Sequence, residues 1–200
     1  MRIAILGGSF NPVHIGHLIL AEEARVKCGY DKIIFVPANM PPHKQLACGA
    51  TSEERLQMLS LAIKDNPFFS IDTCELERGG VSYTYVTLQD FYKRYGSQID
   101  GKIGFIMGDD LVAGFEGWYQ YQKILEIADI ILARRKISGD EKVLKLNYPH
   151  IELANSIFPL SSSEVREKIA GSGRLGGWRY LVPEAVYNYI VQRNLYGKAD

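Results

Sequence analysis

The sequence predicts an α/β fold in which helices cover both faces of a doubly wound parallel sheet. Short apolar runs rich in branched residues, typical of strands buried on both faces, alternate with longer segments typical of helices. This alternation favours right-handed βαβ crossovers and a Rossmann-like sheet. The 200 residues can bury one such core, and 46% of them are hydrophobic. We expect a single domain over residues 1–200, with residues 155–200 as a C-terminal helical subregion.

The first predicted strand covers residues 2–6, and a helix follows from near His14 to Cys28. Gly29 is expected to end this helix, because glycine tolerates the left-handed conformation that is common just past a helix. The apolar run at 32–37 predicts the second strand.

Thr51 and Glu54 form a capping-box pattern, which predicts a helix from 51 to about 66 that ends before Pro67. The remaining elements continue the alternation. Strands are predicted at 68–76, 102–107, 129–133 and 151–153, and helices from 82–84 to 95, at 111–115, from 161 onward and at 183–192.

Composition and charge exclude several classes of protein. The chain has 23 basic and 23 acidic side chains, so nothing indicates an electrostatic nucleic-acid binder. Its three cysteines, Cys28, Cys48 and Cys74, match no zinc pattern and are typical of a reducing compartment. The chain starts directly with a strand, and no apolar run approaches membrane-spanning length. We therefore expect a cytoplasmic protein with no nucleic-acid or membrane partner.

The strongest functional signal is the stretch between the first strand and the first helix, Gly7-Gly8-Ser9-Phe10-Asn11-Pro12-Val13-His14-Ile15-Gly16-His17. Gly7 and Gly8 let backbone N–H groups approach a ligand closely. His14 and His17 stand three residues apart in a first helical turn, so their imidazoles project to the same side. A helix N-terminus also offers unpaired N–H donors and about half a positive charge. This point suits a phosphate group.

The string GGSFNPVHIGH resembles the signature of the HxGH nucleotidyltransferases, in the form found in the bacterial nicotinate-nucleotide adenylyltransferase family. Asn11 stands where that family more often has Asp, and either residue suits a turn. Further motifs of the family follow in order along almost the whole chain. They are PANMPPHK with Lys44, SYTYVTL, Gly108-Asp109-Asp110, Trp118, Arg134 and Leu160–Arg166, in which Ser163 replaces the usual Thr.

This resemblance implies the site residues. His14, His17 and Lys44 are the implied catalytic residues. The implied ATP-binding residues are Gly7, Gly8, Ser9, Phe10, Gly16, Gly108, Asp110, Arg134, Ser161, Ser162 and Arg166. The implied mononucleotide-binding residues are Lys44, Ser82, Tyr83, Thr84 and Trp118, with Trp118 stacking on the pyridine ring. The chain shows no carboxylate cluster for a metal, so Mg²⁺ is expected to arrive with ATP.

The positions of these residues point to one shared site independently of the resemblance. Several of them follow predicted strands directly, and parallel sheets bind ligands at the carboxyl ends of their strands. Each also has a structural alternative. His17 continues the apolar stripe of its helix, the hydroxyls of Ser82, Thr84 and Ser161 suit helix caps, and Trp118 suits ordinary packing.

The implied reaction is attack by the 5′-phosphate of nicotinate mononucleotide on the α-phosphorus of ATP, giving deamido-NAD and pyrophosphate. Nicotinamide mononucleotide and phosphopantetheine are alternative acceptors. A dinucleotide-dependent oxidoreductase is disfavoured, because the first turn is not G-x-G-x-x-G. A non-catalytic nucleotide-binding protein is disfavoured by the two histidines and Lys44. The sequence leaves open whether the chain forms a homo-oligomer.

Overall fold

The structure is a computed structural model that describes residues 1–42, 49–134, 146–172 and 177–197. These residues form a six-stranded sheet in the order β3-β2-β1-β4-β5-β6, and every neighbouring pair is parallel. The strands are β1 (Ile3–Gly8), β2 (Lys32–Pro37), β3 (Phe69–Ile71), β4 (Ile103–Gly108), β5 (Ala128–Ala133) and β6 (Ile151–Leu153). The chain moves outward from β1 to β3, returns, and moves the other way from β4 to β6. The predicted doubly wound sheet is confirmed, and its switch point lies between β1 and β4.

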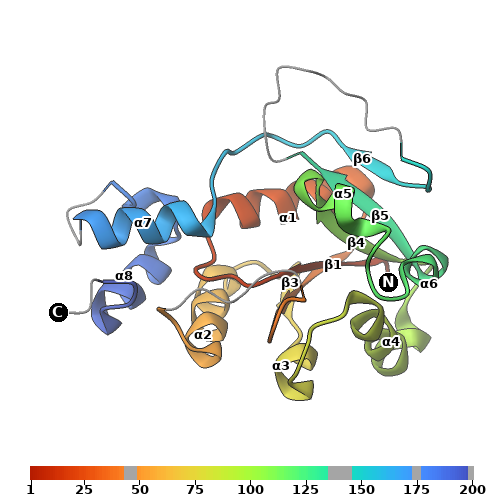
Figure 1. The fold of residues 1–200 in the computed structure, drawn as a ribbon, viewed down its shortest axis with the longest axis horizontal. Helices are drawn as coiled ribbons and strands as arrows, with labels where there is room; N and C mark the ends of the chain where they lie inside the picture. The colour runs from red at the N-terminus through yellow and green to blue at the C-terminus, as the bar shows by residue number, and fades with distance from the viewer. Residues whose placement is uncertain (43–48, 135–145, 173–176, 198–200) are drawn as a thin grey trace.

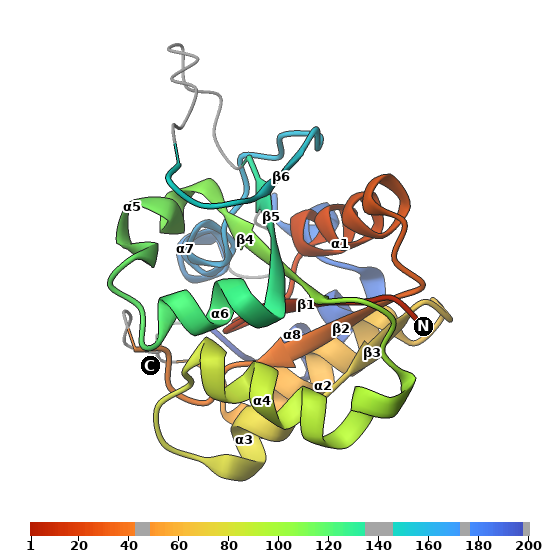
Figure 2. The ribbon, with the colours of Figure 1, turned by 90° about the vertical axis from the view of Figure 1, so that its right-hand side faces the viewer.

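Helices cover both faces of this sheet. Alternate side chains of β1 enter two different cores, Ala4 and Leu6 in one and Ile3 and Ile5 in the other. The first core also takes side chains from α1 (Ile15–Cys28), α2 (Ser52–Ile63), α7 (Ser162–Ser172) and α8 (Glu184–Arg193). The second takes them from α3 (Cys74–Arg78), α4 (Thr84–Tyr95), α5 (Val112–Phe115) and α6 (Tyr121–Ile127). Figures 1 and 2 show α1 on one side of β1 and α3 and α4 on the other.

Local sequence signals account for several helix ends. Gly29 ends α1 with a left-handed φ of 69°, and its N–H donates to the Arg25 carbonyl. Thr51 Oγ1 accepts from the Glu54 N–H at 3.2 Å, and Glu54 Oε2 accepts from the Thr51 N–H at 2.9 Å. Both of these predictions are confirmed. Pro183 precedes α8, as expected for a helix that starts at a proline.

The predicted strand at 68–76 was wrong in its second half. The strand ends at Ile71, and α3 begins at Cys74. The carboxylate of Asp72 accepts from the Cys74 N–H at 2.9 Å, so a side chain takes the place of the next ladder partner and turns the chain into a helix. The sequence analysis also gave no prediction for α6, which has only seven residues.

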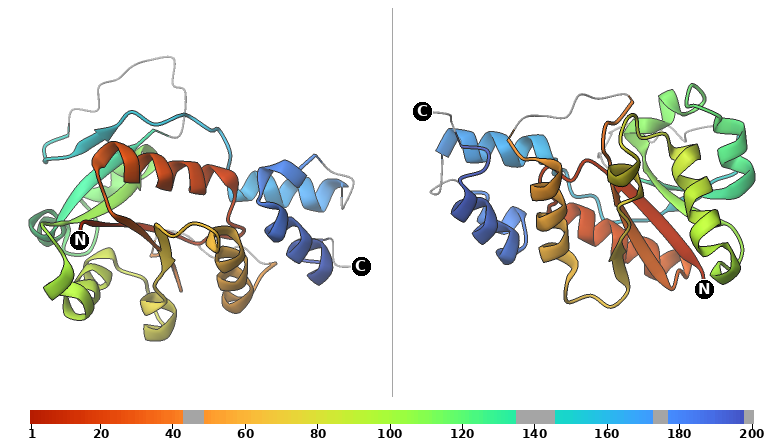
Figure 3. Two further views of the ribbon diagram at one scale, coloured as in Figure 1. Left: turned by 180° about the vertical axis from the view of Figure 1, so that it is seen from behind. Right: turned by 90° about the horizontal axis from the view of Figure 1, so that it is seen from below.

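The C-terminal helices α7 and α8 pack beside the end of the sheet where β1 leads into α1. Figure 3 shows these two helices (blue) at the end of the molecule opposite α4 and α6. Trp178 is buried in the first core and packs on Tyr187 of α8 at 4.6 Å between ring centroids. The start of α7 meets the start of α1, because Ser162 Oγ donates to the Pro12 carbonyl at 2.9 Å. In the described part of the chain, no helix combines the length and the apolar character needed to cross a bilayer.

Candidate active site

A cleft of about 710 Å³ opens at the carboxyl ends of β1 and β4, at the switch point of the sheet. Ligands of doubly wound sheets bind at this place. Most residues predicted from the sequence line it: Gly7, Gly8, Ser9, His14, Gly16, His17, Ser82, Tyr83, Thr84, Gly108, Asp110, Trp118, Arg134, Ser161 and Ser162. The side chains of Phe10 and Arg166 are not part of the lining, and Lys44 lies outside the described residues.

The two histidines of the first turn are held against each other. His14 is the N-cap of α1, and its backbone N–H donates to His17 Nδ1 at 3.2 Å. The two rings stack with centroids 3.7 Å apart and planes 30° apart. Because Nδ1 of His17 accepts a hydrogen bond, the ring proton belongs on Nε2. His17 therefore offers an Nε2–H donor from a fixed tautomer.

Two glycines in the motif make room for aromatic rings. A Cβ atom on Gly16 would lie 3.1 Å from Nδ1 of His14, and one on Gly8 would lie 3.1 Å from Cζ of Phe10. Phe10 is buried with a left-handed φ of 46°, and its ring packs edge-on against His17 at 5.1 Å. The Phe10 ring lies in the core, where it packs against His17. Contact between Phe10 and ATP stays a prediction.

Arg166 reaches from α7 to the loop between β1 and α1. Its Nη1 donates to the Asn11 carbonyl at 2.6 Å and its Nη2 to Ser163 Oγ at 3.0 Å. The guanidinium therefore holds the loop to the first turn of α7. Direct contact between Arg166 and ATP stays a prediction.

The serines at the start of α7 also have partners in the protein. Ser161 Oγ accepts from the Glu164 N–H at 3.1 Å, which makes Ser161 the N-cap of α7. The Ser162 hydroxyl donates to the Pro12 carbonyl, as described above. Both residues line the cleft. Ser161 therefore caps α7 and is also a residue of the candidate site.

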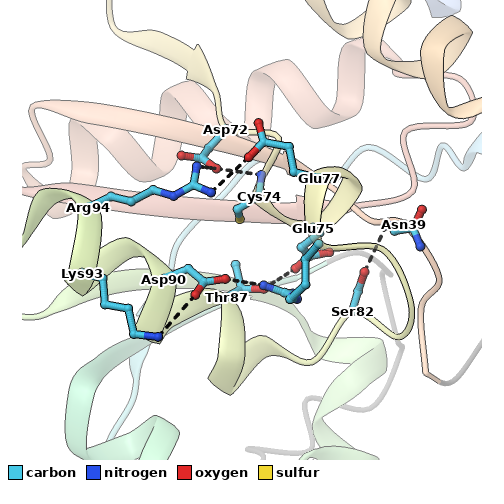
Figure 4. Close-up of polar contacts among 11 residues, drawn as sticks. Asn39, Asp72, Cys74, Glu75, Glu77, Ser82, Thr87, Asp90, Lys93 and Arg94 are labelled. Atoms are coloured by element: carbon cyan, nitrogen blue, oxygen red, sulfur yellow. Dashed lines mark hydrogen bonds and ion pairs between the residues drawn. The ribbon is translucent and has the colours of Figure 1, made fainter.

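The wall of the cleft opposite the two histidines contains a buried polar group around Glu75 (Figure 4). The Thr87 hydroxyl donates to Glu75 Oε1 at 2.6 Å, and Arg78 Nη2 donates to the same hydroxyl oxygen at 3.2 Å. Burial raises the pKa of Glu75, while hydrogen bonds from Thr87 and Ser82 and the charge of Arg78 act the other way. Because Thr87 belongs to α4 and Glu75 to α3, this group joins the two helices.

Ser82 joins this wall to the segment that follows β2. The Asn39 N–H donates to Ser82 Oγ at 3.0 Å, and the Ser82 N–H donates to the Met40 carbonyl at 2.8 Å. Asn39 Nδ2 also donates to the Gly80 carbonyl at 2.9 Å. The segment after β2 and the segment before α4 are thus held together as one wall.

Aromatic residues complete this side of the cleft. The Trp118 ring is half-buried and packs edge-on against Phe115 at 5.3 Å and Phe105 at 6.1 Å. Tyr83 and Tyr119 are exposed and lie 5.0 Å apart between centroids. A flat aromatic ligand would find a fixed ring at Trp118 on which to stack.

Two charged residues close the cleft at the ends of β4 and β5. Asp110 lies in a 3₁₀ turn, Asp109–Leu111, directly after β4. The Arg134 backbone is held by two hydrogen bonds of 2.8 Å to the Asn155 amide, while its side chain is exposed. Among the described residues, no group of three or more His, Cys, Asp or Glu side chains is arranged to hold a metal ion.

Three buried residues next to the site were missed from the sequence: Arg55, Glu75 and Tyr196. Only Arg55 had a signal that could have found it. It precedes Met58 by three residues and Leu59 by four, so it falls on the apolar stripe of α2, where a charge is out of place. Glu75 falls within the predicted strand at 68–76, and nothing local marks Tyr196.

Comparisons with known proteins agree with this geometry. Residues 5–168 match the model of the cytidylyltransferase-like family. A Treponema pallidum protein named as a probable nicotinate-nucleotide adenylyltransferase is 36% identical over 98% of this chain and 99% of its own. A Borreliella afzelii protein of the same name is 40% identical over 99% of this chain and 98% of its own. The structure of Plasmodium falciparum nicotinic acid mononucleotide adenylyltransferase complexed with NaAD has the same fold, with a TM-score of 0.77, 21% identity and coverage of 98% and 97%.

Proposed function

The chain belongs to the cytidylyltransferase-like family and, within it, to the bacterial nicotinate-nucleotide adenylyltransferases, and on this premise we propose that its cleft transfers AMP from ATP to nicotinate mononucleotide. The 5′-phosphate of the mononucleotide attacks the α-phosphorus of ATP. The bond from that phosphorus to the bridging oxygen of the β-phosphate breaks, and pyrophosphate leaves. One observation carries the proposal: a single cleft has the His14–His17 pair on one wall and Trp118 with the start of α4 on the other.

No covalent bond to the protein is needed, so the rate enhancement comes from positioning and charge stabilisation. The Nε2–H of His17 donates to a non-bridging oxygen of the α-phosphate, on which negative charge develops. The N-terminus of α1 and the glycines of the loop receive the same phosphate. Lys44, Ser161 and Ser162 contact the departing pyrophosphate.

The acceptor occupies the wall formed by Ser82, Tyr83, Thr84 and Trp118. The pyridine ring stacks on Trp118, and its carboxylate lies at the N-terminus of α4, whose first turn contains no acidic residue. A carboxylate gains charge-assisted hydrogen bonds there that the amide of nicotinamide cannot fully reproduce. This difference favours nicotinate as the acceptor base.

Mg²⁺ enters this proposal as part of the substrate, bound to the phosphates of ATP. Among the described lining residues, Asp110 and Glu75 are the carboxylates, and Glu75 is already engaged by Thr87. Such a donor set suits a cation that keeps its waters and phosphate ligands and does not suit an all-protein cage.

The decisive experiment is pyrophosphate release by the purified full chain with ATP and each of three acceptors: nicotinate mononucleotide, nicotinamide mononucleotide and phosphopantetheine. We expect nicotinate mononucleotide to have a kcat/KM at least about tenfold above that of the nicotinamide form. Equal values, or a preference for either other acceptor, would refute the assignment.

The chain has two tryptophans, and replacing each in turn tests which of them lies in the binding site. Trp178 is buried outside the cleft, so the Trp178→Phe variant leaves Trp118 as the only tryptophan. In that variant, nicotinate mononucleotide should quench the remaining fluorescence with a saturation curve. Trp118→Phe with Trp178 present should show no such quenching. Saturable quenching from Trp178 alone would remove Trp118 from the acceptor site.

A further inference from the structure

The loop between β1 and α1 is held by side chains that do not line the cleft. Arg55 Nη1, from α2, donates to the Ser9 carbonyl at 2.7 Å. Arg166 Nη1, from α7, donates to the Asn11 carbonyl at 2.6 Å. Tyr196, just after α8, donates its hydroxyl proton to Asn11 Oδ1 at 2.6 Å. We call Arg55, Arg166 and Tyr196 the loop anchor.

Arg55 is the least expected member of the loop anchor. Its side chain is almost fully buried, with 1% of the residue exposed. Its second contact is a hydroxyl, because Nη2 donates to Ser52 Oγ at 3.0 Å. In the part of the chain that the structure describes, no carboxylate lies within ion-pair distance of this guanidinium. Among the described residues, Glu53 acts on this charge electrostatically but forms no ion pair with it, so burying the guanidinium is costly and points to a role beyond packing.

The geometry of the loop shows what Arg55 fixes. A trans peptide is planar, so holding the Ser9 carbonyl also points the Phe10 N–H away from Arg55. Phe10 has the left-handed φ of 46°, which a non-glycine residue holds only when its surroundings enforce it. Its ring supports His17 at 5.1 Å. A chain of contacts therefore runs from Arg55 through Ser9 and Phe10 to His17.

The charge of Arg55 also acts on the loop. Ser9 itself lines the cleft, so the guanidinium lies one hydrogen bond behind a residue of the phosphate side. Little solvent separates the two, because Arg55, Phe10 and Asn11 are all buried. A positive charge in a poorly screened position raises the affinity of the loop for an anion more than a surface charge would.

We propose that Arg55 is a positioning residue for the triphosphate: it fixes the loop that presents His17, and its buried charge favours anion binding on the cleft side of Ser9. The proposal rests on the proposed function for the identity of the anion. Its effect is specific to ATP and to pyrophosphate. The acceptor wall, on the other side of the cleft, should not respond.

The test compares Arg55→Met and Arg55→Lys with Met58→Ala in the full chain. Met58 is fully buried on the same face of α2, one turn beyond Arg55, and its thioether carries neither a charge nor a hydrogen-bond donor. Kinetics with both substrates, calorimetric binding of inorganic pyrophosphate and melting temperature are measured for each variant. Pyrophosphate binding is read without turnover, so it remains informative if no tested acceptor is used.

Arg55→Met should lower kcat/KM for ATP by about 10² or more and weaken pyrophosphate binding by about tenfold, with the acceptor KM changed less than about twofold. Arg55→Lys should recover part of the loss, because an ammonium keeps the charge without the planar fork. Met58→Ala should lower the melting temperature while ATP and pyrophosphate parameters per folded molecule stay unchanged.

Arg55→Met with ATP and pyrophosphate parameters like those of Met58→Ala would overturn the proposal. If Arg55→Met does not fold, Arg55→Lys decides on the same criterion, with an ATP-specific loss in support and none against. Failure of the proposed function itself has a different signature: the unmodified chain releases no pyrophosphate with any acceptor, whether or not Arg55 affects anion binding.

Discussion

His17 has two hydrogen-bonding roles that substitution can separate. Nδ1 accepts from the His14 N–H at 3.2 Å, which forms one half of the capping box at the start of α1, while Nε2–H is the group that we propose donates to the α-phosphate. A lost cap costs about 0.5–2 kcal/mol of unfolding free energy. For a chain of 200 residues this corresponds to roughly 1–8 °C in melting temperature. A lost donor to a developing charge costs about 2.7–4 kcal/mol of the activation barrier, or about 10²–10³ in rate.

His17→Ala removes both roles, so we expect it to melt at a lower temperature and to lose about 10²–10³ in kcat. His17→Asn is the matched control. The Asn Oδ1 takes the place of Nδ1 and accepts from the His14 N–H, but nothing replaces Nε2–H. Its melting temperature should return close to that of the unmodified chain while kcat stays low. Pyrophosphate release and thermal denaturation measure the two effects. Normal activity in His17→Asn, or in the folded fraction of His17→Ala, would refute the catalytic role.

Two further predictions follow from burial. Burial raises the pKa of Glu75 above its ordinary value of 4.5, so Glu75 contributes stability that is present below that value and lost as pH rises through the folded pKa. The melting temperature of Glu75→Gln should therefore rise relative to that of the unmodified chain as pH increases above 4.5, and a difference that does not change with pH would contradict the reasoning. Gly8→Ala places a methyl group 3.1 Å from Phe10 Cζ and should cost about 1–3 kcal/mol of stability by denaturant unfolding. Gly7→Ala, where a Cβ meets nothing within 4 Å, should cost less, and equal losses would show that the Phe10 ring moves aside without a cost in stability.

The phosphate side of the site could be predicted from the sequence because its parts are local. Gly8 ends β1, and His14, Gly16 and His17 lie at the start of α1 one short loop later, so spacing alone brings them together. The supports of that loop could not be predicted in this way. Arg55 meets Ser9 across 46 residues, and Tyr196 meets Asn11 across 185. Such pairs depend on how helices pack, which periodicity does not describe.

The error at 68–76 has a different, local origin. The run from Phe68 to Leu76 has the apolar content of a strand, and only the side chain of Asp72 ends the pairing. The prediction of Lys44 near the phosphates falls outside the described residues and stays a prediction. The order of the strands was predictable as a class, because βαβ units of one hand leave few arrangements open.

The two cores on either side of the sheet support different parts of the cleft. Side chains that support the phosphate loop, such as Phe10 and Tyr196, belong to the first core, whereas Phe105, Phe115 and the packing of Trp118 belong to the second. Because the sheet separates the two cores, a substitution in one core should have little effect on the packing of the other. An enzyme built this way can acquire a new acceptor by drift on the face that carries α3 to α6, while the adenylyl-transfer apparatus on the opposite face is inherited intact.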